Sequence, residues 1–343
     1  MKVIFADRQQ LHDPVMFYSS GARVPHPEKP ERAARLLAAA ERAGLDRETP
    51  DDVGLDTVAA LHSARYLSFL ENIYPRWRRI DGASDEVWPG IHPDSRSGGY
   101  PKSATGQAGF HQWDLSVPIG EHTWQAALSA AHSAVHAATL VVAGERSSYA
   151  LCRPPGHHAT REFAAGFCYL GNTAAAALKL RSRHAKVAVL DVDVHHGNGT
   201  QDLFYTRDDV LTVSIHADPI RFFPFFWGYA NETGEASGRG FNLNIPLARG
   251  TDDDAYLPEL EWALTAIDDF GADALVVALG LDAFEGDPFQ GFRITTGGFG
   301  RIGERIGALD RPTVLVQEGG YLTDELGDNL RSFLEGFMRS HGE

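Results

Sequence analysis

The stretch that decides the fold is Val189-Leu190-Asp191-Val192-Asp193-Val194-His195-His196-Gly197-Asn198-Gly199-Thr200. The apolar, β-branched run over 187–190 predicts a buried strand. Side chains two residues apart in a strand lie on one face, so we expect Asp191, Asp193 and His195 to project together from the strand end. Carboxylates and an imidazole on a rigid element suit a divalent transition metal. The alternative is a buried cluster whose polar groups only bond to one another and bind no ligand, and burying so many polar groups would cost free energy.

Three further segments show the same pattern, in which an apolar run ends in polar residues. They are Tyr149–Cys152 before Arg153-Pro154-Pro155-Gly156-His157-His158, Leu275–Leu281 before Asp282, and Val314–Gln317 before Glu318-Gly319-Gly320-Tyr321. In parallel α/β sheets, functional groups gather at the carboxyl ends of the strands. The four strand ends therefore predict a single site that contains histidines, aspartates and a tyrosine.

Strand-like and helix-like patterns alternate along the 343 residues, of which 43% are hydrophobic. This alternation predicts one α/β domain over 1–343, with a multi-stranded parallel sheet flanked by helices. Helices are expected over 30–44, 57–70, 123–143, 171–180, 255–270 and 299–309. Cys152 and Cys168 fall in segments expected to be buried, which favours reduced thiols over a disulfide.

The formal net charge of −15 disfavours a nucleic-acid partner, because phosphate contacts need clusters of Lys and Arg. An acidic surface attracts cationic ligands, although it also serves solubility alone. The first residues resemble a strand rather than a signal peptide, and no apolar run approaches the length of a membrane span. We therefore expect a cytoplasmic protein with no membrane partner.

The segment 81–116 differs in composition from the rest of the chain. It is rich in Gly, Pro, Ser and aromatic residues and has little periodicity. A structureless loop of this length is usually functional or ordered by a partner. The alternative is a flexible surface loop.

Together these motifs resemble the zinc-dependent deacetylases of the arginase/histone deacetylase superfamily, and most closely the bacterial acetylpolyamine amidohydrolases. The resemblance runs from about Arg23 to about Tyr321 and includes Gly197-Asn198-Gly199-Thr200-Gln201-Asp202, Phe223-Pro224 and 228–234. It implies the arginase/deacetylase fold and hydrolysis of small cationic acetylated amines such as acetylputrescine, acetylcadaverine and acetylspermidine. It also implies a homodimer, in which an insertion at about 81–122 forms the interface and narrows the entrance.

The resemblance implies one Zn²⁺ per subunit, bound by Asp193, His195 and Asp282, and the same ligands would accept Fe²⁺. Asp282-Ala283-Phe284 lacks a second carboxylate, which disfavours an arginase-like pair of manganese ions. By the same resemblance, Asp191 and Ser214 contribute to a structural K⁺ site.

For the histidine pair, the resemblance implies that Asp191 orients His157 and that Asn198 orients His158. An aspartate partner keeps an imidazole cationic more readily than an asparagine does. This predicts that His158 is the general base, and later the acid to the leaving amine. His157 is then mainly an electrostatic element.

Tyr321 is the expected hydrogen-bond donor to the oxyanion, and Gly320 lets the chain approach the metal closely. By resemblance, Phe167 and Phe223 are the walls of the substrate tunnel, and Gly166 and Gly320 belong to the same substrate-binding set.

The residue that receives the distal ammonium of a substrate stays open. The resemblance implies that some members of the family carry acids where this chain has Thr105 and Ser116, and Asp114, Glu121 and Asp94 are other candidates. The main alternative function is a protein lysine deacetylase of the bacterial class II type. A catalytically silent binder of acetylated amines is disfavoured, because every expected catalytic residue is present.

Overall fold

The computed structural model describes residues 1–94 and 99–342. Within them, eight strands form one sheet in the order β4-β1-β5-β10-β9-β6-β7-β8, and all neighbouring strands are parallel. The strands are β1 (Lys2–Ile4), β4 (Asp46–Glu48), β5 (Ser147–Ala150), β6 (Val187–Asp191), β7 (Val210–Ala217), β8 (Asn242–Leu247), β9 (Ala274–Leu279) and β10 (Thr313–Gln317). The predicted parallel α/β sheet is confirmed.

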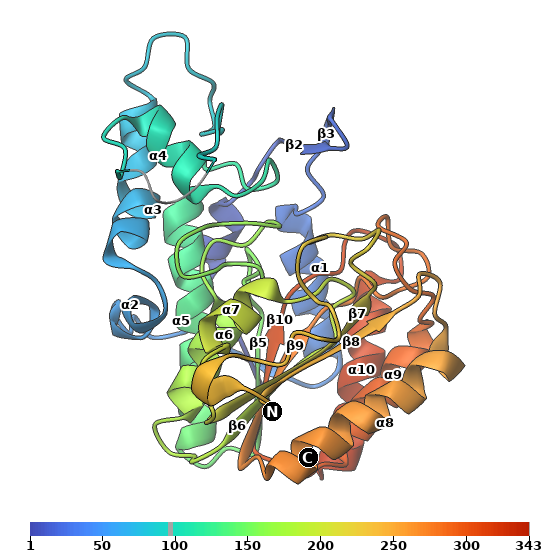
Figure 1. Ribbon diagram of the computed structural model, residues 1–343. Helices are drawn as coiled ribbons and strands as arrows, with labels where there is room; N and C mark the ends of the chain where they lie inside the picture. The colour runs from blue at the N-terminus through green and yellow to red at the C-terminus, as the bar shows by residue number, and fades with distance from the viewer. Residues whose placement is uncertain (95–98, 343) are drawn as a thin grey trace.

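Helices cover both faces of this sheet (Figure 1). One face packs against α5 (Thr123–Val142) and α6 (Asn172–Leu180). The other packs against α1 (Pro30–Arg42), α8 (Asp253–Phe270), α9 (Thr296–Gly307) and α10 (Leu326–His341). Each face of the sheet thus has its own hydrophobic core, the first on the side of α5 and α6 and the second on the side of α1, α8, α9 and α10. Successive residues of a strand point to opposite faces, so Val189 lies in the first core and Leu190 in the second.

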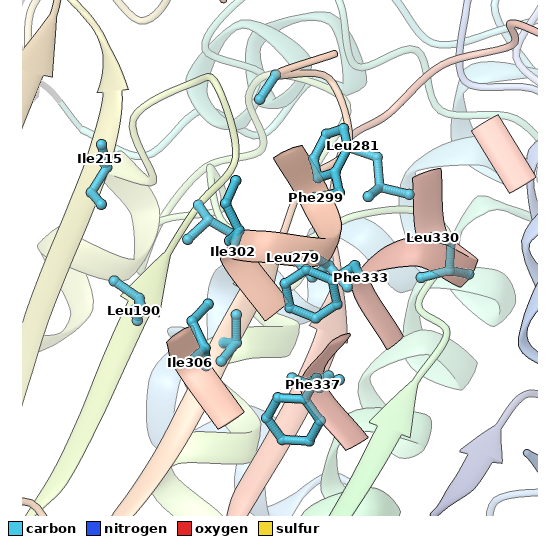
Figure 2. Close-up of a cluster of buried hydrophobic side chains, with 14 of the residues drawn as sticks. Leu190, Ile215, Leu279, Leu281, Phe299, Ile302, Ile306, Leu330, Phe333 and Phe337 are labelled. Atoms are coloured by element: carbon cyan, nitrogen blue, oxygen red, sulfur yellow. The ribbon is translucent and has the colours of Figure 1, made fainter. Parts of the chain in front are cut away.

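The second core holds large aromatic side chains between two helices, as Figure 2 shows. Phe299 and Ile306 of α9 meet Phe333 and Phe337 of α10, and all four are at most 2% exposed. The helices approach closely at Gly303, where a Cβ would lie 2.2 Å from the Phe333 carbonyl oxygen. Only glycine allows this approach, which fixes α9 and α10 against the sheet.

Four central strands end where the sequence places its polar motifs. The strands β5, β10, β9 and β6 are consecutive neighbours, and the histidine pair, Tyr321, Asp282 and the Asp193–His195 segment follow them in that order. The carboxyl edge of the sheet therefore brings together residues that are up to 164 positions apart (321 − 157).

The helix expected over 57–70 is wrong in one respect, because two helices occupy this stretch. They are α2 (Asp56–Leu61) and α3 (Ala64–Trp77). The chain extends at His62 and Ser63, and the Ser63 side chain caps α3 by accepting from the Tyr66 amide. His62, at the break between the two helices, is buried and only 1% exposed.

The segment 81–122 has more structure than its composition predicts. It contains α4 (Ala104–His111), and Val87 forms a bridge with Ile119. The helix was missed because of its glycines. A Cβ at Gly109 would lie 1.7 Å from the Ile91 carbonyl oxygen. Glycine at this position therefore allows close packing of the helix and does not mark a loop. Positions 95–98 of this segment lie outside the described residues.

The remaining elements lie at the edges of the sheet or connect its strands. They are the hairpin β2 (Met16–Ser19) with β3 (Ala22–Pro25), the helix α7 (Asn198–Phe204), and the short 3₁₀ turns η1 (Asp7–Leu11) and η2 (Ala236–Gly238).

Candidate active site

Three ligand atoms converge beyond the ends of β6 and β9. His195 Nδ1 lies 3.1 Å from Asp193 Oδ1 and 3.1 Å from Asp282 Oδ2. All three side chains are buried, and their ligand atoms lie within 4.8 Å of one another. Two buried carboxylates around one imidazole attract positive charge strongly, and this donor set fits a divalent transition metal.

Asp191 does not join this cluster, so the expectation of a continuous alternating strand is wrong beyond that residue. The strand β6 ends at Asp191, whose Oδ1 accepts from the Asp193 amide as the chain turns. Its Oδ2 faces His157 instead. Asp193 and His195 therefore meet Asp282 through a loop rather than through strand periodicity.

Backbone amides hold the carboxylates in place. The Gly319 amide donates to Asp193 Oδ2 over 2.8 Å, and the Val194 amide donates to Asp282 Oδ1 over 3.1 Å. Burial alone would lower the pKa of His195, but its hydrogen bonds to the two aspartates raise that pKa to about 9. The cluster is thus built to hold a cation.

The two histidines after β5 have different partners, as the resemblance implied. His157 Nδ1 lies 2.9 Å from Asp191 Oδ2, and His158 Nδ1 lies 2.7 Å from Asn198 Oδ1. Burial opposes charge on both rings, but the Asp193 and Asp191 carboxylates raise the pKa of His157 to about 10. Burial, together with the nearby imidazoles of His157 and His195, lowers the pKa of His158 well below its usual value.

Tyr321 follows β10, and it lines the same cavity as His158 and His195. Its amide donates to Asp287 Oδ2 over 3.1 Å, and the guanidinium of Arg32 lies over its ring. Gly320 has a φ of 106°, and a Cβ there would lie 2.6 Å from Leu281 Cβ. Glycine is therefore required for the turn that directs Tyr321 toward the metal-ligand cluster.

A cavity of about 550 Å³ leads from the surface to these groups. Phe167 and Phe223 form part of its wall, as expected, and His158, His195 and Tyr321 line it too. His157 is not among the lining residues. Aromatic walls of this kind enclose an extended methylene chain and exclude water.

The wall at Gly166 and Phe167 has unusual backbone geometry. Both residues have a positive φ, 52° and 69°. A Cβ at Gly166 would lie 2.3 Å from the His158 ring, so only glycine lets this loop cover the imidazole. The Gly166 amide donates to Asp114 Oδ2 over 2.9 Å, which ties the wall to the segment before α5.

Only two of the five candidates for the distal ammonium lie at the cavity. Ser116 and Asp114 line it. Thr105 is exposed on α4, and neither it, Asp94 nor Glu121 is among the lining residues.

Sequence reasoning missed three residues that support the site. Glu318 accepts from the amides of Gly156 and His157, and its burial raises its pKa to about 7. Asp287 fixes the Tyr321 backbone, and Arg32 covers the Tyr321 ring. Glu318 had a usable signal, because an acid directly after a buried strand needs partners there, whereas Arg32 resembled an ordinary surface residue of a helix.

Two further predictions concern buried groups nearby. Cys152 and Cys168 are buried and free, as expected. Asp191 and Ser214 are register partners on β6 and β7, and both line one small cavity among mostly polar residues.

The fold and the site define the class of this protein: a parallel α/β protein with a candidate metal centre at the carboxyl edge of its sheet. A histone deacetylase domain matches residues 26–337. The acetylpolyamine amidohydrolase of Burkholderia pseudomallei is 46% identical over 343 residues, which cover 100% of both chains. That of Mycoplana ramosa is 41% identical over 338 residues, 98% of this chain and 99% of the relative.

A solved structure agrees with these relatives. The crystal structure of acetylpolyamine aminohydrolase from Burkholderia pseudomallei superposes with a TM-score of 0.97, at 46% identity and covering 99% of each chain. The chain therefore belongs to the histone deacetylase family and is similar to its acetylpolyamine amidohydrolases, which confirms the family and fold expected from sequence. Membership makes it a hydrolase of the deacetylase type. Among the described residues, no helix is both long and apolar enough to span a membrane.

Proposed function

We propose that this protein removes acetyl groups from small N-acetylated amines, with acetylputrescine, acetylcadaverine and acetylspermidine as the first substrates to test. One observation carries the proposal. The cluster of Asp193, His195 and Asp282 lies beside His158 and Tyr321 at one aromatic-walled cavity. The names of the similar proteins support the same substrate class.

Zinc is the proposed metal, with Fe²⁺ as the alternative, and Asp193, His195 and Asp282 are its ligands. When bound, such an ion lowers the pKa of a coordinated water and polarises an acetyl carbonyl. Asp191 and Ser214 are proposed to contribute to a potassium site, because they are register partners on neighbouring strands and line one small cavity among mostly polar residues.

His158 is the proposed general base. Its Nδ1 faces the Asn198 oxygen and so carries the proton, which leaves Nε2 able to accept one from water. Its ring lines the cavity, whereas that of His157 does not. His157, paired with Asp191, then contributes a fixed positive charge near the reacting groups.

Tyr321 is proposed to donate its hydroxyl to the oxygen of the acetyl group as negative charge develops there. Burial raises the pKa of the Tyr321 hydroxyl well above its usual value, so the group stays protonated and able to donate. Phe167 and Phe223 would hold the methylene chain of the substrate, and Gly166 and Gly320 allow the backbone to pass close to it.

Acetate release from zinc-loaded protein tests the proposal directly. The three acetylated amines are compared with an acetyl-lysine peptide at equal concentration. Turnover of the small amines with little peptide cleavage is the expected result. Efficient cleavage of the peptide would favour the protein lysine deacetylase alternative, and turnover of neither would contradict the deacetylase assignment.

A homodimer formed through the segment 81–122 and a cytoplasmic location complete the proposal. Light scattering on purified protein tests the dimer, and a mass equal to one chain would contradict it. Fractionation of the source cells tests the location, and recovery outside the cytoplasm would contradict it.

A further inference from the structure

Two neighbouring cavities lie outside the candidate active site. The smaller, of about 180 Å³, lies between the end of η1 and the start of α5, and the larger, of about 450 Å³, lies between α3 and α5. Gly120 and Glu121 line both cavities, which we therefore call together the Glu121 groove. No residue of this groove lines the active-site cavity, so the groove is a separate surface feature.

The smaller cavity is lined by a buried histidine that lacks one partner. His12 is 2% exposed, and its Nδ1 lies 3.1 Å from Thr123 Oγ1, but its Nε2 has no hydrogen-bond partner within the described part of the chain. Burial, aided by nearby Arg153, lowers the pKa of His12 well below its usual value, so the ring is neutral. With its proton on Nδ1, facing the Thr123 oxygen, the ring has a free lone pair on Nε2. Such a buried acceptor costs free energy unless a bound donor satisfies it.

Carboxylates give the smaller cavity a negative charge. Asp13, Glu86 and Glu121 line it, and no lysine or arginine is among its described lining residues. Lys29 pairs with Asp13 over 3.4 Å, and the start of α5 adds about half a positive charge. Glu86 accepts from one backbone amide over 3.2 Å, and Glu121 is exposed with no ion pair found in residues 1–94 and 99–342. These two carboxylates therefore leave an excess of negative charge.

The larger cavity adds aromatic surface to this charge. Tyr74 and Trp124 line it together with Glu71 and Arg78, and the Arg78 guanidinium lies 2.8 Å from Asp85. Aromatic rings pack against methylene groups and attract an ammonium over their faces. A ligand with both kinds of group suits this wall.

A directly coordinated metal ion suits the groove less well. Among the described residues, three ligand atoms from His, Cys, Asp or Glu come within 4.8 Å of one another at two places, and neither lies in the groove. An ammonium needs no such tight cluster, since its three donors reach acceptors that lie further apart.

We propose that the Glu121 groove binds a linear amine that carries two or more ammonium groups. One ammonium lies in the smaller cavity, where it donates to His12 Nε2 beside Glu86, and the rest of the chain passes Glu121 toward Trp124. This site is additional to the active site, and its occupation does not depend on the proposed deacetylation.

Calorimetry on the zinc-loaded protein at low salt tests the proposal with spermidine, putrescine and butylamine, which carry three, two and one ammonium groups. The Kd should be lowest for spermidine and highest for butylamine, and it should rise with added salt. Equal Kd values for the three amines would overturn the proposal. So would Mg²⁺ displacing putrescine at equal concentration, because charge alone would then explain the binding.

The variant Glu121→Gln locates the site. It should raise the Kd of spermidine about threefold or more, the range of an exposed ion pair, and leave kcat/KM for acetylputrescine unchanged. Glu41→Gln, the same change at an exposed residue of α1 that lines neither cavity, should leave both values unchanged. An unaltered Kd in Glu121→Gln would assign the binding to another site and overturn the proposal.

His12→Phe removes the free nitrogen and keeps a ring in its place, and it should also raise the Kd of spermidine. If this variant does not fold, Glu86→Gln answers the same question in the smaller cavity. Unchanged binding in the folded variant would exclude this cavity. A protein that binds spermidine with this pattern but releases no acetate would contradict the proposed function and leave the groove assignment standing.

Discussion

The guanidinium carbon of Arg32 lies 5.0 Å from the centroid of the Tyr321 ring. Arg32 also donates to the carbonyls of Gly320 and Glu318, the second over 2.8 Å, and it pairs with Glu28 over 2.6 Å. A single buried side chain on α1 thus supports both the Tyr321 ring and the turn that precedes it.

Replacing this guanidinium by an ammonium should loosen Tyr321. We expect Arg32→Lys to lower kcat by about tenfold with little change in KM, because a lysine cannot reproduce the planar fork. Steady-state kinetics measure the effect. Arg35→Lys, on the exposed side of the same helix, is the matched control. A raised KM with an unchanged kcat would place Arg32 in substrate binding instead.

The hydroxyl of Tyr321 should matter for turnover and not for the metal. Tyr321→Phe is expected to lower kcat by about 100-fold, the usual cost of losing one donor to an oxyanion. Zinc content, measured by elemental analysis, should stay the same. Tyr256→Phe, at a buried tyrosine outside the cavity, controls for packing. Full activity in Tyr321→Phe would remove the hydroxyl from the chemistry.

The two neighbouring histidines should respond differently to truncation. His158→Ala should lose roughly 100-fold or more in kcat, as general bases do, and His157→Ala should lose less. Parallel kinetics on the two variants, with circular dichroism to confirm folding, decide the order. A larger loss in His157→Ala would make His157 the base.

Removing one carboxylate should abolish metal binding. Asp282→Ala deletes one of three ligand side chains, and we expect its zinc content to fall close to zero after dialysis. Asp287→Asn, a change at a nearby buried acid outside the ligand set, should keep one zinc per chain. Full zinc content in Asp282→Ala would exclude Asp282 as a ligand.

Acid should destabilise the fold through His62. Its Nδ1 lies 2.8 Å from the Thr160 carbonyl, and its Nε2 accepts from the Gly171 amide over 3.0 Å, so the ring is neutral with no place for a second proton. Burial lowers its pKa from 6.5 to about 4. Between these values the unfolded chain binds the extra proton, so stability falls as pH falls, by about 1.4 kcal/mol per unit for one group.

Urea unfolding at several pH values tests this account. His62→Gln should show a weaker loss of stability between pH 6.5 and 4 than the unmodified protein. His122→Gln, at an exposed histidine, should show the same loss as the unmodified protein. An unchanged slope in His62→Gln would mean that His62 titrates alike in both states.

The sequence predicted the strands that carry the site because their apolar runs end abruptly in polar residues, as at β6 and β9. It did not yield β7, β8 or α10, whose patterns were not recognised. Asp193 and His195 were predicted to share a face with Asp191, but the strand ends at Asp191, and hydrogen bonding within the turn that follows decides where Asp193 and His195 lie. The roles of Arg32 and Asp287 depend on contacts between distant segments, such as Arg32 with Tyr321, which local periodicity cannot encode.

The position of β10 has a consequence for how the chain acquires activity during synthesis. This strand is the last of the sheet in sequence, yet it lies between β5 and β9. Until residues 313–317 have left the ribosome and inserted there, the sheet is split and Tyr321 is absent from the cavity. A nascent chain therefore cannot turn over substrate early. The appearance of activity would report the final strand insertion, a step that such long-range pairing makes slow.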